Sequence, residues 1–198
     1  LVPLLLDVEP ADDADAAVAD ILRGWDYRFR LDGSAPTVFL TWAEMLSRRL
    51  IADELADLPA RMRDRQYLAL IRALSGERAG WCDDRRSEAV EDCPKQLRAS
   101  LTDARRALED AFGTDPSRWT WGATHRLKLP HLGFAGLPLL DDLFSREVAM
   151  PGGPESLFLN SVSLLNAPHF SRAIFNSAYQ GIYDLSDLDA SLFMTGGG

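Results

Sequence analysis

The spacing of apolar residues changes near Thr114, and this change limits the fold more than any other feature of the sequence. Before it, apolar side chains recur at intervals of three and four, the period of an amphipathic helix. After it, glycine and proline recur and short strand-like runs appear. The sequence therefore predicts an α+β chain, with a helical region at residues 1–113 and a strand-rich region at residues 114–198.

Four helices are expected in the first region, each with residues that typically begin or end a helix. Asp12 or Asp13 can cap the first helix, and Ser34 can cap the second, which Pro59 closes. Gly113 ends the last helix, which has the most regular apolar stripe in the chain. The expected ranges are Asp12–Trp25, residues 34–58, Asp64–Leu74 and Cys93–Phe112.

The second region contains short runs that are typical of strands, separated by segments rich in glycine and proline. Such runs need pairing partners, because an unpaired strand edge exposes backbone hydrogen-bonding groups. The predicted strands lie within Ser156–Leu165, Ser171–Asn176, Gly181–Leu185 and Ala190–Thr195.

The charge of the chain argues against two classes of partner. The chain of 198 residues has 21 Lys and Arg and 30 Asp and Glu, giving a net charge of −9. Neither region is basic, so binding to nucleic acid through its phosphates is not expected. No apolar run approaches the roughly 20 residues that a membrane helix needs, so a membrane partner is not expected either.

The two cysteines, Cys82 and Cys93, are eleven residues apart. This spacing does not match the CxxC motif of redox proteins, and a zinc site needs about four ligands. All three histidines lie in the second region, so a shared metal site has no support from the pattern. The spacing favours a disulfide over a metal site or free thiols, and a disulfide indicates a compartment outside the cytosol.

A few aromatic and polar residues after the helical region are candidates for a site. Trp119 and Trp121 are two apart and would face one side of a strand, where they could line an acyl-group pocket or belong to the core. His125 could be structural, or could act with His131 and the acidic pair 141–142 in a metal-assisted hydrolase. No HExxH motif and no GxSxG motif accompanies them.

Several segments together resemble the penicillin acylase family of N-terminal-nucleophile hydrolases, in the later part of the large (β) subunit. They are WCDD at residues 81–84, the second cysteine, a long helix ending in Phe-Gly, and WTWG followed by His125. PGGPESLFLNSVS, at residues 151–163, resembles a glycine-rich strand of the same family. The resemblance covers nearly the whole chain.

The resemblance implies a fold and a reaction. It implies that the strand-rich region contributes to the sheet of an αββα sandwich. The family hydrolyses an acyl amide, such as a penicillin or an acyl-homoserine lactone, to a carboxylic acid and an amine. The nucleophile is a serine at the first position of the large subunit, with its own α-amino group as the base.

The resemblance places the reacting groups outside this sequence. Residue 1 is Leu, and no Ser-Asn pair followed closely by Trp is present, so no catalytic residue, cofactor site or metal site is assigned here. The partners expected are the small subunit and the N-terminal part of the large subunit, and calcium is expected only in the full enzyme. Both ends look cut, and a periplasmic or secreted location is expected. The alternative is a truncated, non-catalytic binding or structural fragment.

Overall fold

The computed structural model describes residues 1–51, 66–154, 156, 160–164, 171–176 and 179–195. The chain divides into two compact units. The helical unit comprises Leu1–Arg28 and Asp32–Trp121, and the sheet unit comprises Phe29–Leu31 and Gly122–Gly198. The structure contains both helices and strands, which is compatible with the α+β class expected from the sequence.

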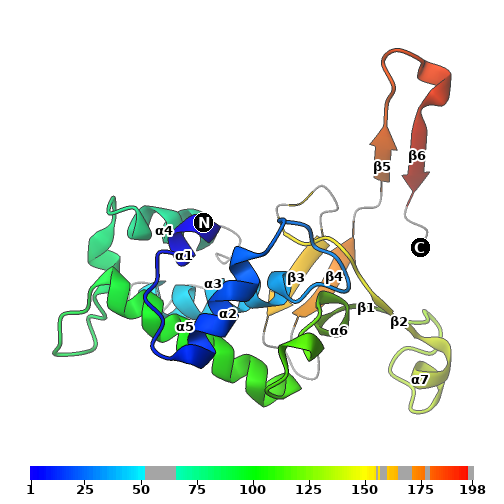
Figure 1. The fold of residues 1–198 in the computed structure, drawn as a ribbon. Coiled ribbons are helices and arrows are strands. Elements are labelled where there is room, and N and C mark those ends of the chain that lie inside the picture. The colour runs from blue at the N-terminus through cyan, green and yellow to red at the C-terminus, as the bar shows by residue number, and fades with distance from the viewer. Residues whose placement is uncertain (52–65, 155, 157–159, 165–170, 177–178, 196–198) are drawn as a thin grey trace. The chain divides into compact units, whose positions relative to one another are not determined.

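The helical unit is built on α3 and α5, which pack along each other, with α2 against both and α4 against α3 (Figure 1). A 3₁₀ turn at Ala79–Cys82 lies between α4 and α5. The helices are α1 (Val2–Leu5), α2 (Asp13–Arg23), α3 (Ala35–Ile51), α4 (Gln66–Leu74) and α5 (Cys93–Phe112). In the part of the chain that the structure describes, no helix has the length and apolar character needed to cross a bilayer.

Helix α5 forms where the sequence predicts it, for reasons visible at both ends. The Asp92 carboxylate caps the helix by accepting a hydrogen bond from the Lys95 backbone N–H at 2.8 Å. Gly113 follows the last turn with a φ of +84°, a conformation that favours glycine. Between these ends, the side chains at intervals of four, three and four are buried: Leu97, Leu101, Ala104 and Leu108.

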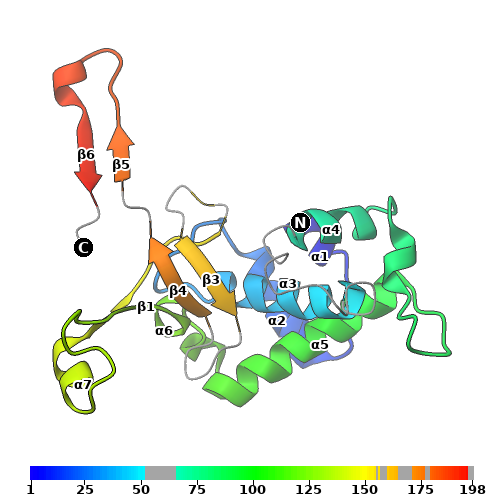
Figure 2. The same ribbon diagram turned by 180° about the vertical axis from the view of Figure 1, so that it is seen from behind.

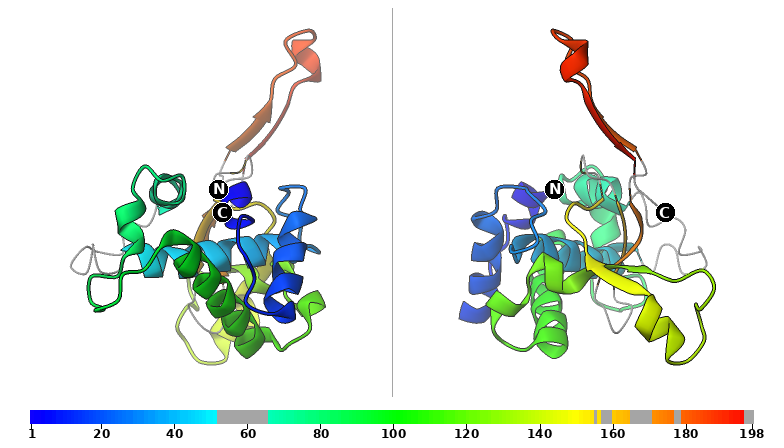
Figure 3. Two further views of the ribbon diagram at one scale, coloured as in Figure 1. Left: turned by 60° about the vertical axis from the view of Figure 1, so that its left-hand side comes forward. Right: turned by 90° about the vertical axis from the view of Figure 1, so that its right-hand side faces the viewer.

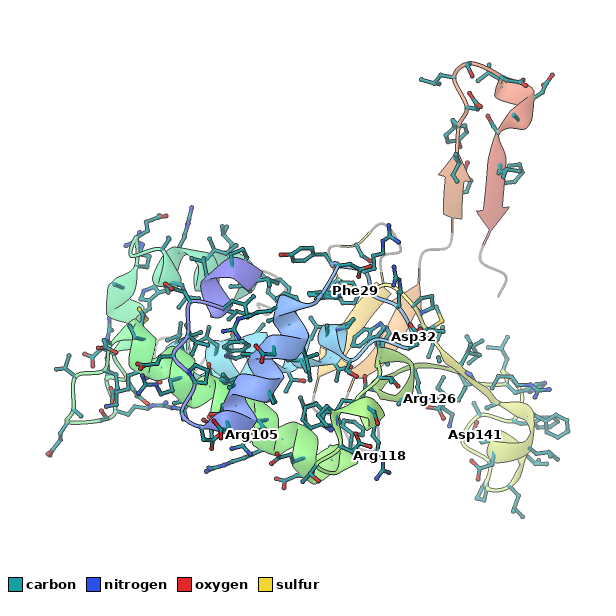
Figure 4. The ribbon with its side chains drawn as sticks, viewed as in Figure 1. Phe29, Asp32, Arg105, Arg118, Arg126 and Asp141 are labelled. Carbon is teal, nitrogen blue, oxygen red and sulfur yellow. A yellow bond between two sulfur atoms is a disulfide. The ribbon has the colours of Figure 1, made fainter. Side chains whose placement is uncertain are left out.

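Polar contacts join the three packed helices. The Trp42 indole N–H of α3 donates to the Ser100 hydroxyl of α5 at 3.0 Å, and both residues are buried. Asp15, in the first turn of α2, is fully buried and accepts a hydrogen bond from Arg105 Nε at 2.6 Å. Arg105 lies on α5 where that helix passes α2 (Figure 4). The helix pair α2–α5 is therefore held by a buried ion pair as well as by apolar packing.

The main sheet of the sheet unit has the strand order β2-β1-β4-β3 (Figure 1), and Figure 2 shows β1, β4 and β3 from the other side. The central pair β1–β4 is parallel, and the outer pairs β1–β2 and β3–β4 are antiparallel. The pairing of β3 with β4 shifts register between Asn160 and Val162. The strands are β1 (His125–Leu129), β2 (Arg146–Ala149), β3 (Asn160–Leu164) and β4 (Ser171–Asn176).

Strands β5 (Tyr179–Ile182) and β6 (Leu192–Thr195) form a separate antiparallel ribbon (Figure 3). Large apolar side chains on this ribbon and its connecting turn are exposed to solvent. Ile182 is 72% exposed, Phe193 is 73% exposed and Leu185 is 88% exposed. A two-stranded ribbon with this much exposed apolar surface is marginal in water unless another element covers it.

The structure corrects some of the expected elements. The strand predicted at Gly181–Leu185 exists but is shifted toward the N-terminus, because β5 is Tyr179–Ile182 and the chain leaves it before Leu185. Helix α1, helix α6 (Trp121–Thr124), β1, α7 (Leu140–Phe144) and β2 were not predicted from the sequence. The closing role of Pro59, the start of a helix at Asp64, and residues 157–159 and 165 of the run 156–165 lie outside the described residues.

Candidate functional site

The residues proposed for an acyl pocket are buried in the described structure. Trp119 is 1% exposed, and Trp121 and His125 are 0% exposed. The Trp119 indole N–H donates to the Gly113 carbonyl at 2.9 Å, which satisfies its only donor. This burial and pairing are what core packing requires, and an acyl-pocket role for the three residues stays a prediction.

The argument that the two tryptophans share a face of a strand is wrong. Trp119 ends a 3₁₀ turn, Pro116–Arg118, and Trp121 is the first residue of the short helix α6. The chain turns here because the Asp115 carboxylate accepts a hydrogen bond from the Ser117 backbone N–H at 2.9 Å and closes a local turn. Trp119 and Trp121 therefore occupy different local structures, although both are buried.

The WTWG segment is anchored by its backbone. The Trp121 backbone N–H donates to the Gly33 carbonyl at 2.8 Å, and the Gly122 backbone N–H donates to the Leu31 carbonyl at 2.8 Å. A Cβ added at Gly122 would lie 3.0 Å from the Leu31 carbonyl oxygen, which is closer than ordinary packing allows. The glycine after the second tryptophan is therefore required by a close backbone approach.

His125 is the first residue of β1 and pairs with Ser171 of the parallel strand β4. Its carbonyl accepts a hydrogen bond from the Met150 backbone N–H at 3.1 Å. The His125 side chain is fully buried in the described structure, which favours the structural role over a catalytic one.

His131 does not form a catalytic arrangement with the nearby acidic and hydroxyl groups. The Ser145 hydroxyl is bonded to Asp141, and it also accepts a hydrogen bond from the His131 backbone N–H at 3.1 Å. The His131 imidazole instead accepts from the Gly133 backbone N–H at 3.2 Å and stacks on Phe134.

Hydrogen bonds from Lys128, at 2.8 Å, and from Ser145 lower the pKa of Asp141. These contacts fold the loop that carries α7. Among the hydrogen bonds of the described residues, none joins the His131 imidazole to the Ser145 hydroxyl. Among the described residues, no group of three or more His, Cys, Asp or Glu side chains is placed to hold a metal ion.

Cys82 and Cys93 form a disulfide, which joins the 3₁₀ turn to the first residue of α5. Carboxylates strengthen the loop that it closes. Asp83 accepts a hydrogen bond from the Glu91 backbone N–H at 3.0 Å, and Glu91 accepts from the Asp84 backbone N–H at 3.2 Å. The loop is therefore fixed at its base by a covalent bond and by two side-chain to backbone bonds.

A cavity of about 350 Å³ lies beside this loop, within the helical unit. Its walls come from α3, α5 and the disulfide loop, and they carry both cationic and anionic side chains. No pattern in the sequence indicated it, because the three segments that form it are distant along the chain. The only sequence signal is that both helices carry charged residues at helical spacing beside their apolar stripes.

The chain was also compared with known proteins. A model of the family described as penicillin amidase matches residues 1–198, the whole chain. A search of curated proteins found no match.

Proposed function

The chain belongs to the penicillin amidase family, and we propose that it forms the later part of the large subunit of an N-terminal-nucleophile acylase. Membership gives the coarse activity, that of an acylase-type amide hydrolase. The observation that carries the proposal is the match of the family over all of residues 1–198. The strands of the sheet unit would then belong to an αββα sandwich that other segments complete.

The proposed reaction cleaves the carbon–nitrogen bond of an acyl amide, from a penicillin, an acyl-homoserine lactone or a related compound. A serine hydroxyl in another segment of the enzyme attacks the carbonyl, its proton passes through the α-amino group of the same serine, and the amine leaves. Water then hydrolyses the acyl-enzyme ester to a carboxylic acid. We assign none of these steps to the described residues and propose that this chain supplies the scaffold around the reacting groups.

Calcium, which the resemblance associates with the full enzyme, does not fit the residues described. They contain no group of three or more His, Cys, Asp or Glu side chains placed to hold a metal ion, so no step of the reaction is assigned to a metal here.

The exposed ribbon β5–β6 supports the proposal that other enzyme segments cover this chain. Its side chains Tyr179, Ile182 and Phe193 are more than half exposed, although they are of types that sheets normally bury. We assign their cover to the segment that carries the nucleophilic serine, because the same segment must supply the rest of the sheet. The disulfide supports a periplasmic or secreted location for the assembled enzyme.

The test uses the natural protein. Intact-mass analysis with peptide mapping of the purified enzyme is expected to show a serine-initiated large subunit that contains the present sequence, together with a separate small subunit. Hydrolysis of a panel of penicillins, acyl-homoserine lactones and simple acyl anilides is expected to release the corresponding carboxylic acid. Alanine in place of the first serine should abolish that release. Acyl release by the present chain alone, without the serine-initiated part of the large subunit, would refute the proposal.

A further inference from the structure

The cavity beside the disulfide loop has an apolar floor between two packed helices. Met45 of α3 and Ala99 of α5 are partly buried and line it. On α5, Gln96, Ala99 and Asp103 are three and four residues apart and so share one helix face. A cavity of about 350 Å³ is at the small end of the range for ligand sites.

Gln96 is the most informative residue of the cavity, because it is only 4% exposed. Its side-chain oxygen accepts a hydrogen bond from Arg49 Nη1 at 3.3 Å. Within the part of the chain that the structure describes, its amide nitrogen donates to no protein group. Buried amide groups are normally paired, so this donor calls for an acceptor that enters through the cavity.

Two cationic side chains, Lys95 and Arg48, line the cavity with Gln96 and have N–H groups that can donate hydrogen bonds to a ligand. Lys95 Nζ is 3.8 Å from Glu91, a loose contact on an exposed side chain. Arg48 bonds Glu44 through Nε at 3.0 Å, and its two terminal nitrogens make no bond among the described residues.

Other charged side chains of the cavity walls form ion pairs with each other. Arg49 contacts Asp103 at 2.6 Å, and Arg86 contacts Asp84 at 2.8 Å through two bonds. Hydrogen bonds from Arg86 lower the pKa of Asp84 to about 2, so that this carboxylate is charged at neutral pH. With Glu91, the walls carry four cationic and three anionic side chains, an excess of one positive charge.

We propose that this cavity binds a small monocarboxylate that carries a short apolar tail. The carboxylate would accept hydrogen bonds from the Gln96 amide and from Lys95 or Arg48, and the tail would cover Met45 and Ala99. The excess of one positive charge matches one negative charge, and the three wall carboxylates disfavour a dianion such as phosphate. A cation is disfavoured because the unpaired buried group is a donor. This site is separate from the reaction proposed above.

The probe is sodium n-butyrate, titrated into the uniformly ¹⁵N-labelled full chain at pH 7 and constant ionic strength. Saturable shifts of the Gln96 side-chain amide signals and of the backbone amide signals of residues 95–103 are expected, with a dissociation constant on the order of 1 mM for so small a ligand. The backbone signals report binding in the variants, including Gln96→Glu, which has no side-chain amide. n-Butylamine and inorganic phosphate, each at the same concentration, are expected to leave those signals unsaturated.

Three variants give the test its direction. Gln96→Glu keeps the oxygen that accepts from Arg49 and replaces the donor by a carboxylate oxygen. It should weaken butyrate binding by about tenfold or more and strengthen n-butylamine binding. Lys95→Gln should weaken butyrate binding by roughly threefold or more. The control, Arg106→Gln, removes a positive charge from an exposed position on the same helix outside the cavity and should change binding by less than about twofold.

Four results would each overturn the proposal: no saturable shift up to about 50 mM butyrate, equal binding of butyrate and n-butylamine, tight binding of phosphate, or unchanged affinity in Gln96→Glu. Equal weakening by Arg106→Gln and Lys95→Gln would overturn it as well, since that pattern reports the net charge of the chain. Circular dichroism confirms that each variant is folded, and Lys95→Gln, an exposed position, keeps the test open if Gln96→Glu fails to fold.

Discussion

The ion pair between Asp15 and Arg105 allows a quantitative prediction about what holds α2 to α5. Asp15 is fully buried and accepts hydrogen bonds from Arg105 Nε at 2.6 Å and from the Thr102 hydroxyl. The Arg105 side chain is 13% exposed and also contacts Glu109 at 3.0 Å. Removing one member of a buried ion pair typically costs about 3–5 kcal/mol, because the other charge stays buried without its partner.

The two single substitutions should differ in cost. In Asp15→Asn, Arg105 keeps Glu109 as a partner, so the free energy of unfolding should fall by about 2–3 kcal/mol, below the usual range. In Arg105→Met, the fully buried Asp15 keeps only Thr102, so the loss should be about 4 kcal/mol. The double variant should lose less than the sum of the two, with a coupling energy of about 2 kcal/mol.

The assay is urea unfolding, followed by circular dichroism at 222 nm, for the parent, both single variants and the double variant. Arg106→Gln, an exposed substitution on the same helix, is the control and should stay within about 0.5 kcal/mol of the parent. Strictly additive losses, or a loss below about 1 kcal/mol in Arg105→Met, would refute the reasoning.

The pH dependence of this contact follows from the charge of Arg105. The hydrogen bond to Asp15 raises the arginine pKa above its ordinary value. A group whose pKa is raised on folding stabilises the native state fully below its unfolded-state pKa, and this contribution is lost as pH rises through the folded-state value. Both values lie above the neutral range, so Arg105 should contribute equally to stability from pH 6 to pH 9, measured by the same urea unfolding.

Three further predictions concern the loop and the WTWG segment. Replacing both disulfide cysteines by serine should lower the free energy of unfolding by roughly 3 kcal/mol, measured in urea, and dithiothreitol should then have no further effect. Arg86→Gln should raise the pKa of Asp84 from about 2 toward its ordinary value in a carboxyl NMR titration, because hydrogen bonds from Arg86 lower it. Any stability that the Asp84 carboxylate provides is present above its unfolded-state pKa and is lost as pH falls through about 2. Gly122→Ala should lower the melting temperature, at a cost of about 1–3 kcal/mol, because its Cβ would meet the Leu31 carbonyl, whereas Gly80→Ala, which has nothing within 4 Å, should have little effect.

The helices of the first region could be predicted because their signals are local. The apolar stripe lies within the twenty residues of α5, with the capping Asp92 directly before them and Gly113 directly after, and α2 likewise begins after Asp12 and ends before Gly24. The buried role of Asp15 could not be predicted, because its partner Arg105 is 90 positions away and only the packing of α2 on α5 brings them together.

The strands were harder to predict for physical reasons that differ between them. In β1, His125 and Leu127 are buried and Arg126 and Lys128 are less so, an alternation that the sequence does contain. In β2 the side chains do not alternate between buried and exposed, since all of Arg146–Ala149 is exposed or partly exposed. This segment is a strand only because its backbone pairs with β1, and the sequence does not reveal that pairing. The cavity was beyond prediction, since it depends on how α3, α5 and the disulfide loop meet.

The short segment Phe29–Leu31 belongs to the sheet unit, although the residues on both sides of it belong to the helical unit. Its carbonyls accept hydrogen bonds from the backbone N–H groups of Gly152, at 3.1 Å, and Gly122, at 2.8 Å. If the chain were divided at one point, after Trp121, this tripeptide would therefore remain with the helical unit, although it belongs to the sheet unit. Anyone producing the sheet unit by itself will have to graft those three residues onto it, as in a circular permutant, or add them back as a separate peptide.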